Sequence, residues 1–394
     1  MADLPFQLFD ADNHYYEATD AFTRHIEPGF EKRCIQWAEI SGKTRLLVGG
    51  KLNRFIPNPT FDPVARPGVL DEFFRGKNPA AADMRTLFGE LEPISPAYRN
   101  RDARLSLMDG QGIERAFFFP TLGVGMEEAL KEDLPAQQAA FRAFNRWLEE
   151  DWGFSYRERI FAAPYITLSS VENAVAELEW AIARDARVVC MVAGPIWTAN
   201  GSKSPADPGF DPFWARVNEA GLTVAYHGGD YGYGKYMEDW GESGSLESFK
   251  NTPLKGIMLG NRAPFDTMAA LICHRLFERF PGVRVCSVEQ GSNWVPWLFQ
   301  SFRRSWGQAP SAYAEDPIET FKRHIWVSPF HEDDVLELRE LLGADRLLMG
   351  SDYPHAEGLA DPTEYVNELK GFEADEIRLV MRENAIGLSQ RQPA

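Results

Sequence analysis

The sequence has few cysteines and no long apolar run, and each absence excludes a class of protein. The 394-residue chain has no stretch of 18 apolar residues, which excludes a membrane-spanning helix. Its four cysteines show no CxxC spacing, so they predict neither a zinc site nor a disulfide framework. Two of them, Cys190 and Cys286, lie inside apolar runs, as is typical of buried thiols in a reducing environment. We therefore expect a cytoplasmic protein.

Positive charge is scarce as well. The chain has 41 Lys and Arg residues against 58 Asp and Glu residues, which gives a formal net charge of −17 at pH 7. This excess of acidic residues disfavours nucleic acid and anionic membranes as partners. We expect the partners to be a small-molecule substrate and further copies of the same chain, in a homodimer or a higher homo-oligomer.

Short apolar segments alternate with amphipathic helices along most of the chain. The predicted strands are residues 6–17, 115–120, 160–166, 187–193, 222–226, 283–288, 324–328 and 346–352. Continuous apolar runs are typical of parallel strands that are covered on both faces. Eight such units predict an α/β fold, a (β/α)8 TIM barrel, and an open doubly wound sheet is the alternative. No glycine-rich phosphate turn follows the first strand, which favours the barrel.

Residues 18–100 interrupt this alternation. The segment is rich in Pro, Asn, Arg and aromatic residues, and so many helix breakers exclude one long helix. We treat residues 1–394 as a single barrel domain with an irregular insertion after the first strand. So long a segment is usually functional or an interface, so a substrate lid and a surface or dimer arm are both open.

The first predicted strand ends in the motif Asp-x-Asp-x-His. Side chains alternate between the two faces of a strand, so Asp10, Asp12 and His14 are predicted to share one face. Buried carboxylates need a partner, because unpaired buried charge is costly. A divalent metal ion is the simplest partner, and a structural hydrogen-bonded pair is the alternative.

Later strands end in residues of the same kind. His227 ends the fifth, Glu289 follows the sixth, and Asp352 ends the eighth with His355 just beyond. In a barrel the active site lies at the carboxyl ends of the strands, so we expect these side chains to meet those of the first strand. Imidazoles and carboxylates together favour zinc, manganese or ferrous iron. Asp352 and Glu289 are the candidate catalytic acids or bases, and Glu289 is alternatively a ligand or a salt-bridge residue.

Several residues near the strand ends are predicted to contact a substrate: His331, His355, Tyr231, Trp197 and Asn293. Tyr231 belongs to residues 228–236, which mix glycines with aromatic residues after a predicted ligand strand. Such a loop is expected either to close over a ring-shaped substrate or to be a plain surface loop. His274 is expected in the middle of a helix as a packed structural residue.

Four segments, residues 12–14, 227–229, 279–284 and 345–355, together resemble the amidohydrolase superfamily. The resemblance covers nearly the whole chain. It is closest to the branch that contains aminocarboxymuconate-semialdehyde decarboxylase and the resorcylate and carboxyvanillate decarboxylases.

The resemblance implies one metal ion, bound by Asp12, His14, His227 and Asp352. Zinc is the first choice, with manganese or iron as alternatives. Asp12 replaces the first residue of the family's His-x-His motif and is closer to the Glu-x-His of several decarboxylases. Binuclear relatives bridge two ions with a modified lysine on the fourth strand, where this sequence has no lysine.

The activity that the resemblance implies is metal-dependent decarboxylation, a C–C lyase reaction, of a small cyclic or aromatic carboxylic acid. The related decarboxylases carry a histidine where this sequence has Glu289. Hydrolysis of a C–N, ester or lactone bond by metal-activated water is therefore the alternative. A second alternative is a barrel that binds a small molecule without catalysis, which would hold no stoichiometric metal.

Overall fold

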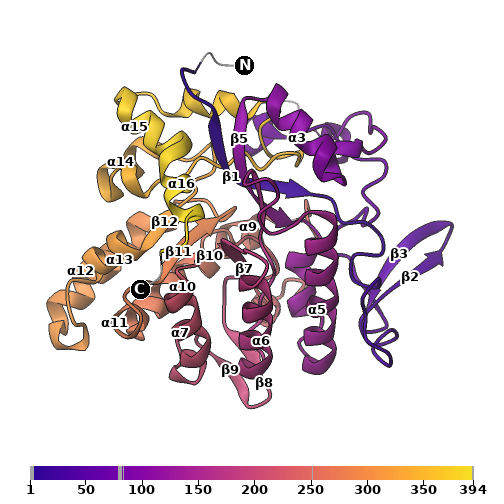
Figure 1. Cartoon of the computed structure of the whole chain (residues 1–394), viewed down its shortest axis with the longest axis horizontal. Helices are drawn as coiled ribbons and strands as arrows, with labels where there is room; N and C mark the ends of the chain where they lie inside the picture. Colours follow the sequence, from indigo (N-terminus) through magenta and orange to yellow (C-terminus); the bar gives the residue numbers. More distant parts are fainter. Residues whose placement is uncertain (1–3, 79–81, 83, 251, 393–394) are drawn as a thin grey trace.

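Parallel strands form two sheets around a common core in the computed structural model (Figure 1). The first sheet has the order β1 (Leu8–Tyr15), β5 (Ile113–Pro120), β6 (Ile160–Ala162). The second has the order β12 (Ile325–Val327), β11 (Arg284–Val288), β10 (Thr223–His227), β7 (Val188–Val192). The structure describes residues 4–78, 82, 84–250 and 252–392, so the predicted domain (1–394) and insertion (18–100) include positions outside it. The α/β class is confirmed.

The eighth predicted strand is not a strand, although its neighbours hold it in place. Residues 347–353 make single parallel bridges to β12, at Val327, and to β1, at Asn13. The backbone N–H of Asp352 donates to the carbonyl of Asp12 at 2.9 Å. Asp352 has a φ of 55°, outside the extended region, which interrupts regular pairing. A further single bridge joins Tyr165 to Cys190 in β7, and closure of the two sheets into a barrel remains a prediction.

Helices cover the sheets on the outside (Figure 1). The longer ones are α3 (Arg101–Gly110), α5 (Leu134–Asp151), α6 (Val171–Ile182), α7 (Asp211–Ala220), α10 (Arg262–Cys273), α12 (Trp294–Gln308), α13 (Pro317–His324) and α14 (Val335–Leu342). Gly221 ends α7 in the left-handed conformation, with a φ of 63°. His274 caps the end of α10 rather than lying inside a helix, because Arg275 turns the chain with a φ of 60°.

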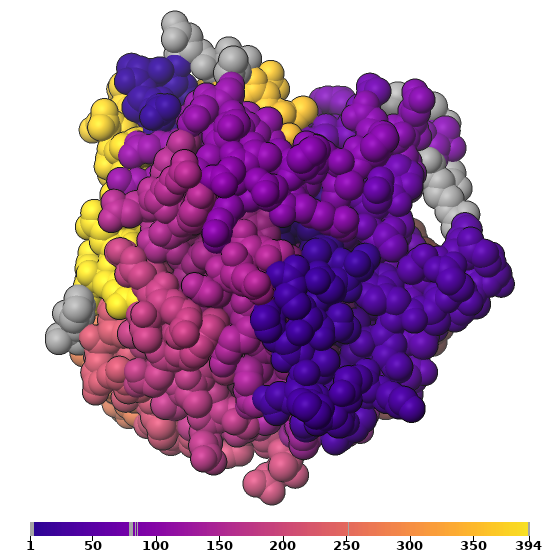
Figure 2. Space-filling model, turned by 45° about the vertical axis from the view of Figure 1, so that its right-hand side comes forward, coloured from indigo at the N-terminus to yellow at the C-terminus, as the bar shows by residue number. Residues whose placement is uncertain are grey.

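Part of residues 18–100 forms a small antiparallel sheet that the sequence analysis did not predict. Its strands are β2 (Ile35–Ile40), β3 (Lys43–Val48) and β4 (Lys51–Leu52). The hairpin of β2 and β3 projects from the body of the molecule (Figure 1). The rest of the segment packs against one side of the body (Figure 2). Arg24 and Arg33 pair with Asp151 and Asp133 near the two ends of α5. Exposed pairs of this kind are weak, so they orient the segment more than they stabilise it.

None of the helices in the described ranges is both long and apolar enough to cross a bilayer.

Candidate metal centre

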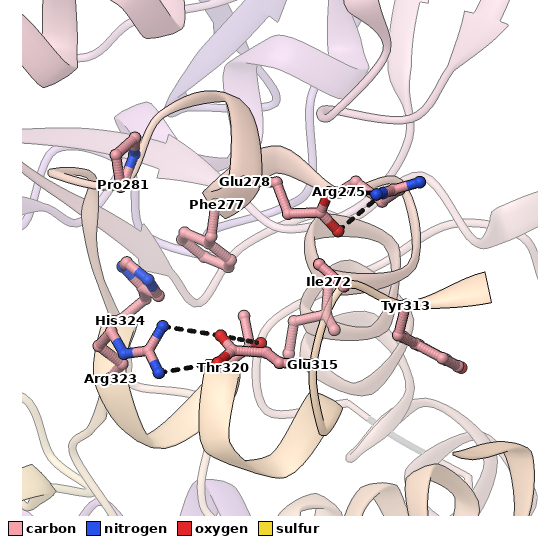
Figure 3. Close-up of a pocket in the computed structure, with 11 residues that line it drawn as sticks. Ile272, Arg275, Phe277, Glu278, Pro281, Tyr313, Glu315, Thr320, Arg323 and His324 are labelled. Atoms are coloured by element: carbon pink, nitrogen blue, oxygen red, sulfur yellow. Dashed lines mark hydrogen bonds and ion pairs between the residues drawn. The ribbon is translucent and has the colours of Figure 1, made fainter. Parts of the chain in front are cut away.

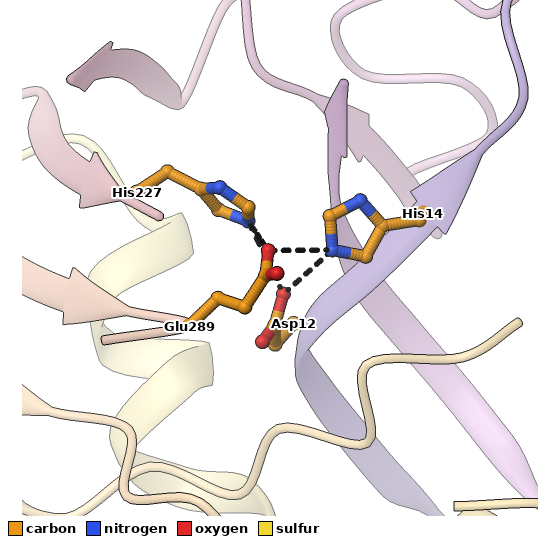
Figure 4. A group of neighbouring side chains, drawn as sticks. All are labelled: Asp12, His14, His227 and Glu289. Atoms are coloured by element: carbon orange, nitrogen blue, oxygen red, sulfur yellow. Dashed lines mark ion pairs between the residues drawn. The ribbon is translucent and has the colours of Figure 1, made fainter. Parts of the chain in front are cut away.

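Five acidic or imidazole side chains converge where the strands end, and we call them the strand-end cluster: Asp12, His14, His227, Glu289 and Asp352. In four of them, Asp12, His14, His227 and Glu289, the ligand atoms all lie within 4.8 Å of one another. Figure 4 shows these four side chains pointing toward one another from β1, β10 and the end of β11. The sequence prediction that the first strand meets the later ones at one site is therefore correct in its geometry.

The separations within the cluster fit a shared cation. His14 Nε2 lies 3.2 Å from Asp12 Oδ1, 3.2 Å from Asp352 Oδ1 and 3.5 Å from Glu289 Oε2. His227 Nε2 lies 3.2 Å from Glu289 Oε2 and 3.5 Å from Asp12 Oδ1. Ligands bound at about 2.1 Å from one ion are roughly 3.0 Å apart at right angles and roughly 3.4 Å apart in a tetrahedron. The cluster is thus spaced as a set of ligands is spaced.

Several polar atoms of the cluster are buried and make no hydrogen bond of normal geometry. They are Asp12 Oδ1, His14 Nε2, His227 Nε2 and Asp352 Oδ1. Buried polar atoms are nearly always paired, so these four need a common partner. His227 Nδ1 lies 3.0 Å from the carbonyl of Gly228, which orients the ring so that Nε2 faces the other side chains.

The electrostatics of the cluster favour bound positive charge. Burial acts to raise the pKa of Asp12, but His14 and His227 outweigh it and hold the pKa below its usual value. Burial acts to lower the pKa of His14, but Asp12, Asp352 and Glu289 raise it well above the usual value. Asp12 is therefore ionised, and a divalent cation would balance its charge.

Two residues of the cluster have an unusual backbone. Glu289 has a φ of 51° and Asp352 a φ of 55°, in the left-handed region that favours glycine. Such conformations cost energy and persist where the surrounding structure holds them, often at functional sites. Gly350 is also required, because a Cβ there would lie 2.5 Å from Ser328 Oγ and 2.6 Å from Asp12 Cβ.

His355 extends the cluster on one side. Its Nδ1 lies 2.6 Å from Asp352 Oδ1, and its Nε2 lies 2.9 Å from Thr121 Oγ1. A separation of 2.6 Å is too short for two ligands of one ion, so His355 Nδ1 and Asp352 Oδ1 form a direct ion-pair contact instead. Thr121, which also donates to the carbonyl of Tyr15 at 2.9 Å, was not identified from the sequence.

The prediction that Asp10 shares a face with Asp12 and His14 is wrong. The pairing of β1 with β5 is irregular between Asp10 and Asn13, which breaks the strict alternation of faces. Asp10 accepts hydrogen bonds from Asn13 Nδ2 at 2.8 Å and from the backbone N–H and hydroxyl of Ser351 at 3.0 and 2.5 Å. It ties β1 to residues 347–353 instead of facing the cluster.

Arg104 is a second neighbour that the sequence analysis missed. It lies fully buried in α3 and donates to the backbone carbonyl of His14. The aromatic rings of Tyr98, Phe118 and Tyr353 surround its guanidinium. In sequence it is one more charged residue on an amphipathic helix, and only the tertiary structure shows that it supports β1.

The residues predicted to contact substrate do not all meet at the cluster. Burial, and to a lesser extent the charge of Glu289, raises the pKa of Tyr231. The ring of Trp197 packs against Gly232, which lies in the same loop as Tyr231. A Cβ at Gly232 would lie 2.1 Å from the ring of Trp197. His331 Nε2 lies 2.6 Å from Asp71 Oδ1. Asn293 lines a separate cavity of about 240 Å³. The substrate roles of these residues stay predictions.

A cavity of about 230 Å³ lies at the other end of the sheets, and we call it the amino-end pocket (Figure 3). It is lined by residues of α10, α11 (Leu276–Arg279) and α13, just before β11 and β12 begin. Its charged side chains pair within the pocket, Arg275 with Glu278 and Arg323 with Glu315. It contains none of the predicted site residues.

Comparison with known proteins identifies the family. A sequence model described as amidohydrolase matches residues 91–388. An amidohydrolase from Mycobacterium avium subsp. paratuberculosis K-10 is 42% identical over 99% of each chain, with a TM-score of 0.94. The chain belongs to the amidohydrolase family. This amidohydrolase is therefore an enzyme of the metal-dependent lyase or hydrolase kind, and its family has a TIM-barrel fold.

More distant structures share the fold of this amidohydrolase. A dihydroxybenzoic acid decarboxylase from Polaromonas sp. JS666, with bound manganese, is 16% identical, with a TM-score of 0.57 over 82% of this chain and 93% of that one. A 5-carboxyvanillate decarboxylase from Novosphingobium aromaticivorans DSM 12444, also with bound manganese, is 14% identical, with a TM-score of 0.57 over 98% and 97%. At such identities the likeness concerns the fold.

Proposed function

We propose that this amidohydrolase is a decarboxylase that uses one divalent metal ion to remove CO2 from a small cyclic or aromatic carboxylic acid. The observation that carries the proposal is the strand-end cluster, whose unpartnered donor atoms are spaced for one cation. The distant structures named above act on ring carboxylic acids and contain manganese, which supports the choice of substrate class. A closed barrel, a single domain with an insertion, a cytoplasmic location and a homodimer or larger assembly are parts of the same proposal.

The residues that would hold the ion are Asp12, His14, His227 and Asp352. When bound, the ion would polarise the substrate's carboxylate and an adjacent ring oxygen. Zinc, manganese and iron all suit a mixed carboxylate and imidazole site.

Asp352 and His355 would supply the proton that decarboxylation needs. The bond between the ring carbon and the carboxylate breaks, CO2 leaves, and the ring carbon takes up one proton. The ion-pair contact of 2.6 Å between Asp352 Oδ1 and His355 Nδ1 places an imidazole that can carry a proton at the edge of the cluster. Both residues are 8% exposed, so bulk water has little access to the reacting carbon.

Hydrolysis of a C–N, ester or lactone bond is the second candidate, and Glu289 is the observation that favours it. Its carboxylate lies within 3.5 Å of both cluster imidazoles, where it could accept a proton from an attacking water. A barrel that binds a small molecule without catalysis is the remaining alternative.

Product analysis separates these functions. The metal-loaded protein is incubated with hydroxylated benzoic acids and, separately, with small lactones, esters and amides. We expect CO2 release from the acids and, in D2O, one deuterium at the former carboxyl position. Water-dependent products from the second set without CO2 would establish hydrolysis. No product from either set, with no stoichiometric metal, would favour simple binding.

A further inference from the structure

We infer that Glu289 is itself a ligand of the metal ion, and that its carboxylate raises the affinity of the centre for Mn²⁺ relative to Zn²⁺, compared with a histidine in its place. The inference rests on the proposed metal-dependent function and assigns Glu289 one role among those that the sequence leaves open. Relatives were expected to carry a histidine at this position, so the role belongs to this chain's own side chain.

The first argument is positional. Glu289 Oε2 lies 3.2 Å from His227 Nε2 and 3.5 Å from His14 Nε2. Asp12 Oδ1 has the reverse pair of distances, 3.2 Å from His14 Nε2 and 3.5 Å from His227 Nε2. The two carboxylates therefore occupy equivalent places around the two imidazoles (Figure 4). An ion that binds both imidazoles and Asp12 has Glu289 within reach as well.

The second argument concerns membership of the possible ligand sets. Glu289 and His14 belong to both groups of close donor atoms, the one with Asp12 and His227 and the one with Asp352 and His355. Asp352 belongs to only one of them. Wherever an ion sits within the strand-end cluster, Glu289 is next to it.

The third argument is what holds the Glu289 carboxylate in place. Among the described residues its closest polar contacts are the imidazoles of His14 and His227, and no hydrogen bond fixes its side chain. Asp352 Oδ1, in contrast, lies 2.6 Å from His355 Nδ1, and His355 Nε2 is hydrogen-bonded to Thr121 Oγ1 at 2.9 Å. This division suits Asp352 and His355 for moving a proton and leaves the Glu289 oxygen for the ion.

The chemistry of the donors then sets the preference for a metal. With Glu289, three carboxylates and two imidazoles surround the ion. Carboxylate oxygens suit hard ions such as Mn²⁺ and Mg²⁺, whereas imidazole suits Zn²⁺ and Fe²⁺. Replacing a histidine by Glu289 adds a negative charge and a hard donor, and both changes favour Mn²⁺ relative to Zn²⁺.

Calorimetric titration of the metal-free protein with Mn²⁺ and, separately, with Zn²⁺ tests the inference. For Glu289→Gln we expect Mn²⁺ affinity to fall roughly 10–100-fold or more. For Glu289→His we expect the ratio of Mn²⁺ to Zn²⁺ affinity to fall at least about tenfold. The electron paramagnetic resonance spectrum of bound Mn²⁺ should change in both variants.

Glu357→Gln is the matched control. Glu357 is a partly buried acid whose Oε2 has no hydrogen bond. Burial and the charges of Asp352 and Glu289 raise its pKa. It belongs to neither group of close donor atoms. Its variant should keep Mn²⁺ affinity within about threefold. Far-ultraviolet circular dichroism of each metal-free variant checks that it is folded.

The outcomes separate this inference from the proposed function. If the wild type binds no ion, the metal-dependent function itself fails. If the wild type binds Mn²⁺ and Glu289→Gln binds it equally well, only the ligand role of Glu289 is wrong. If Glu289→Gln and Glu357→Gln lose affinity equally, the loss comes from disturbance of the acidic side chains around the site, and the ligand role is again wrong.

Discussion

The two ends of the parallel sheets carry similar residue types in opposite arrangements. In the amino-end pocket, Arg323 binds both carboxylate oxygens of Glu315, at 2.7 and 2.9 Å. In the strand-end cluster, three carboxylates and two imidazoles face one another with unpartnered buried atoms. The first arrangement is complete within the protein, and the second needs a partner from outside.

Because its buried polar atoms lack partners, the strand-end cluster is the group of charges that we expect to have a function. Arg323 lowers the pKa of Glu315, so this acid is stabilised in its ionised form by its neighbour. The buried Glu17, at the other end, has its pKa raised to about 7 by burial. Charges that lack a partner cost stability and are kept where they bind or react, so perturbing the two ends should have unequal effects.

The largest effect is expected from Asp352→Asn. The change removes a ligand and the proton carrier, so kcat should fall roughly 10²–10⁴-fold. The rate is measured as CO2 release, together with metal content by elemental analysis. The matched change in the amino-end pocket, Glu315→Gln, should leave the rate unchanged. Equal rates for Asp352→Asn and the wild type would contradict the assignment of Asp352.

A smaller effect, on stability against pH, is expected at Glu17. Its Oε1 accepts from the backbone N–H groups of Leu122 and Gly123, at 2.9 and 3.0 Å, and its Oε2 has no hydrogen bond. The pKa of the Glu17 carboxyl is about 7 in the folded state, against 4.5 in the unfolded chain. The resulting stability is fully present below pH 4.5 and is lost as the pH rises through 7.

Glu17→Gln removes this titration, and urea unfolding between pH 4 and 8 measures the result. Relative to the wild type, the variant should gain about 3 kcal/mol of unfolding free energy across that range. A constant difference between the two proteins at every pH would show that Glu17 has the same pKa in the folded and the unfolded state.

Gly350→Ala should disturb the cluster through packing alone. The new Cβ would overlap Ser328 and Asp12, so residues 347–353 must shift away from β1. We expect a loss of about 1–3 kcal/mol in unfolding free energy, together with weaker Mn²⁺ binding. Thermal unfolding and calorimetry measure the two effects. Gly256→Ala, at a position where a Cβ meets nothing within 4 Å, is the control.

The smallest effect is expected from Arg323→Met in the amino-end pocket. Its ion pair with Glu315 is largely exposed, so the unfolding free energy should fall by at most about 1 kcal/mol. Metal affinity and rate should not change. A loss of metal binding in this variant would show that the two ends of the sheets are coupled, and the contrast between them would no longer hold.

The sequence predicts the strands that are continuous apolar runs, because burial on both faces leaves a clear pattern. It fails for residues 347–353, where Gly350 and the left-handed Asp352 interrupt the pairing. It also misses the β2–β3 hairpin, although Ser41 and Gly42, with φ of 54° and 71°, form the kind of two-residue turn that joins such strands. The many prolines of residues 18–100 obscured that signal.

The candidate site was predictable to the extent that it lies at strand ends. Asp12, His14, His227 and Glu289 follow from the rule that a barrel places its site there. Thr121 and Arg104 were missed because their contacts join segments far apart in the chain. The orientation of Asp10 was wrong because one irregular pairing in β1 reverses the alternation, and local sequence does not reveal it.

The hydrogen bonds of Asp10 to Ser351 span 341 positions of the chain. They fasten the opening strand to residues that leave the ribosome near the end of synthesis. A nascent chain that stops before residue 350 has β1 without this attachment and without Asp352. An ion held by Asp352 together with β1, as proposed above, would therefore gain its full ligand set only when translation is nearly complete.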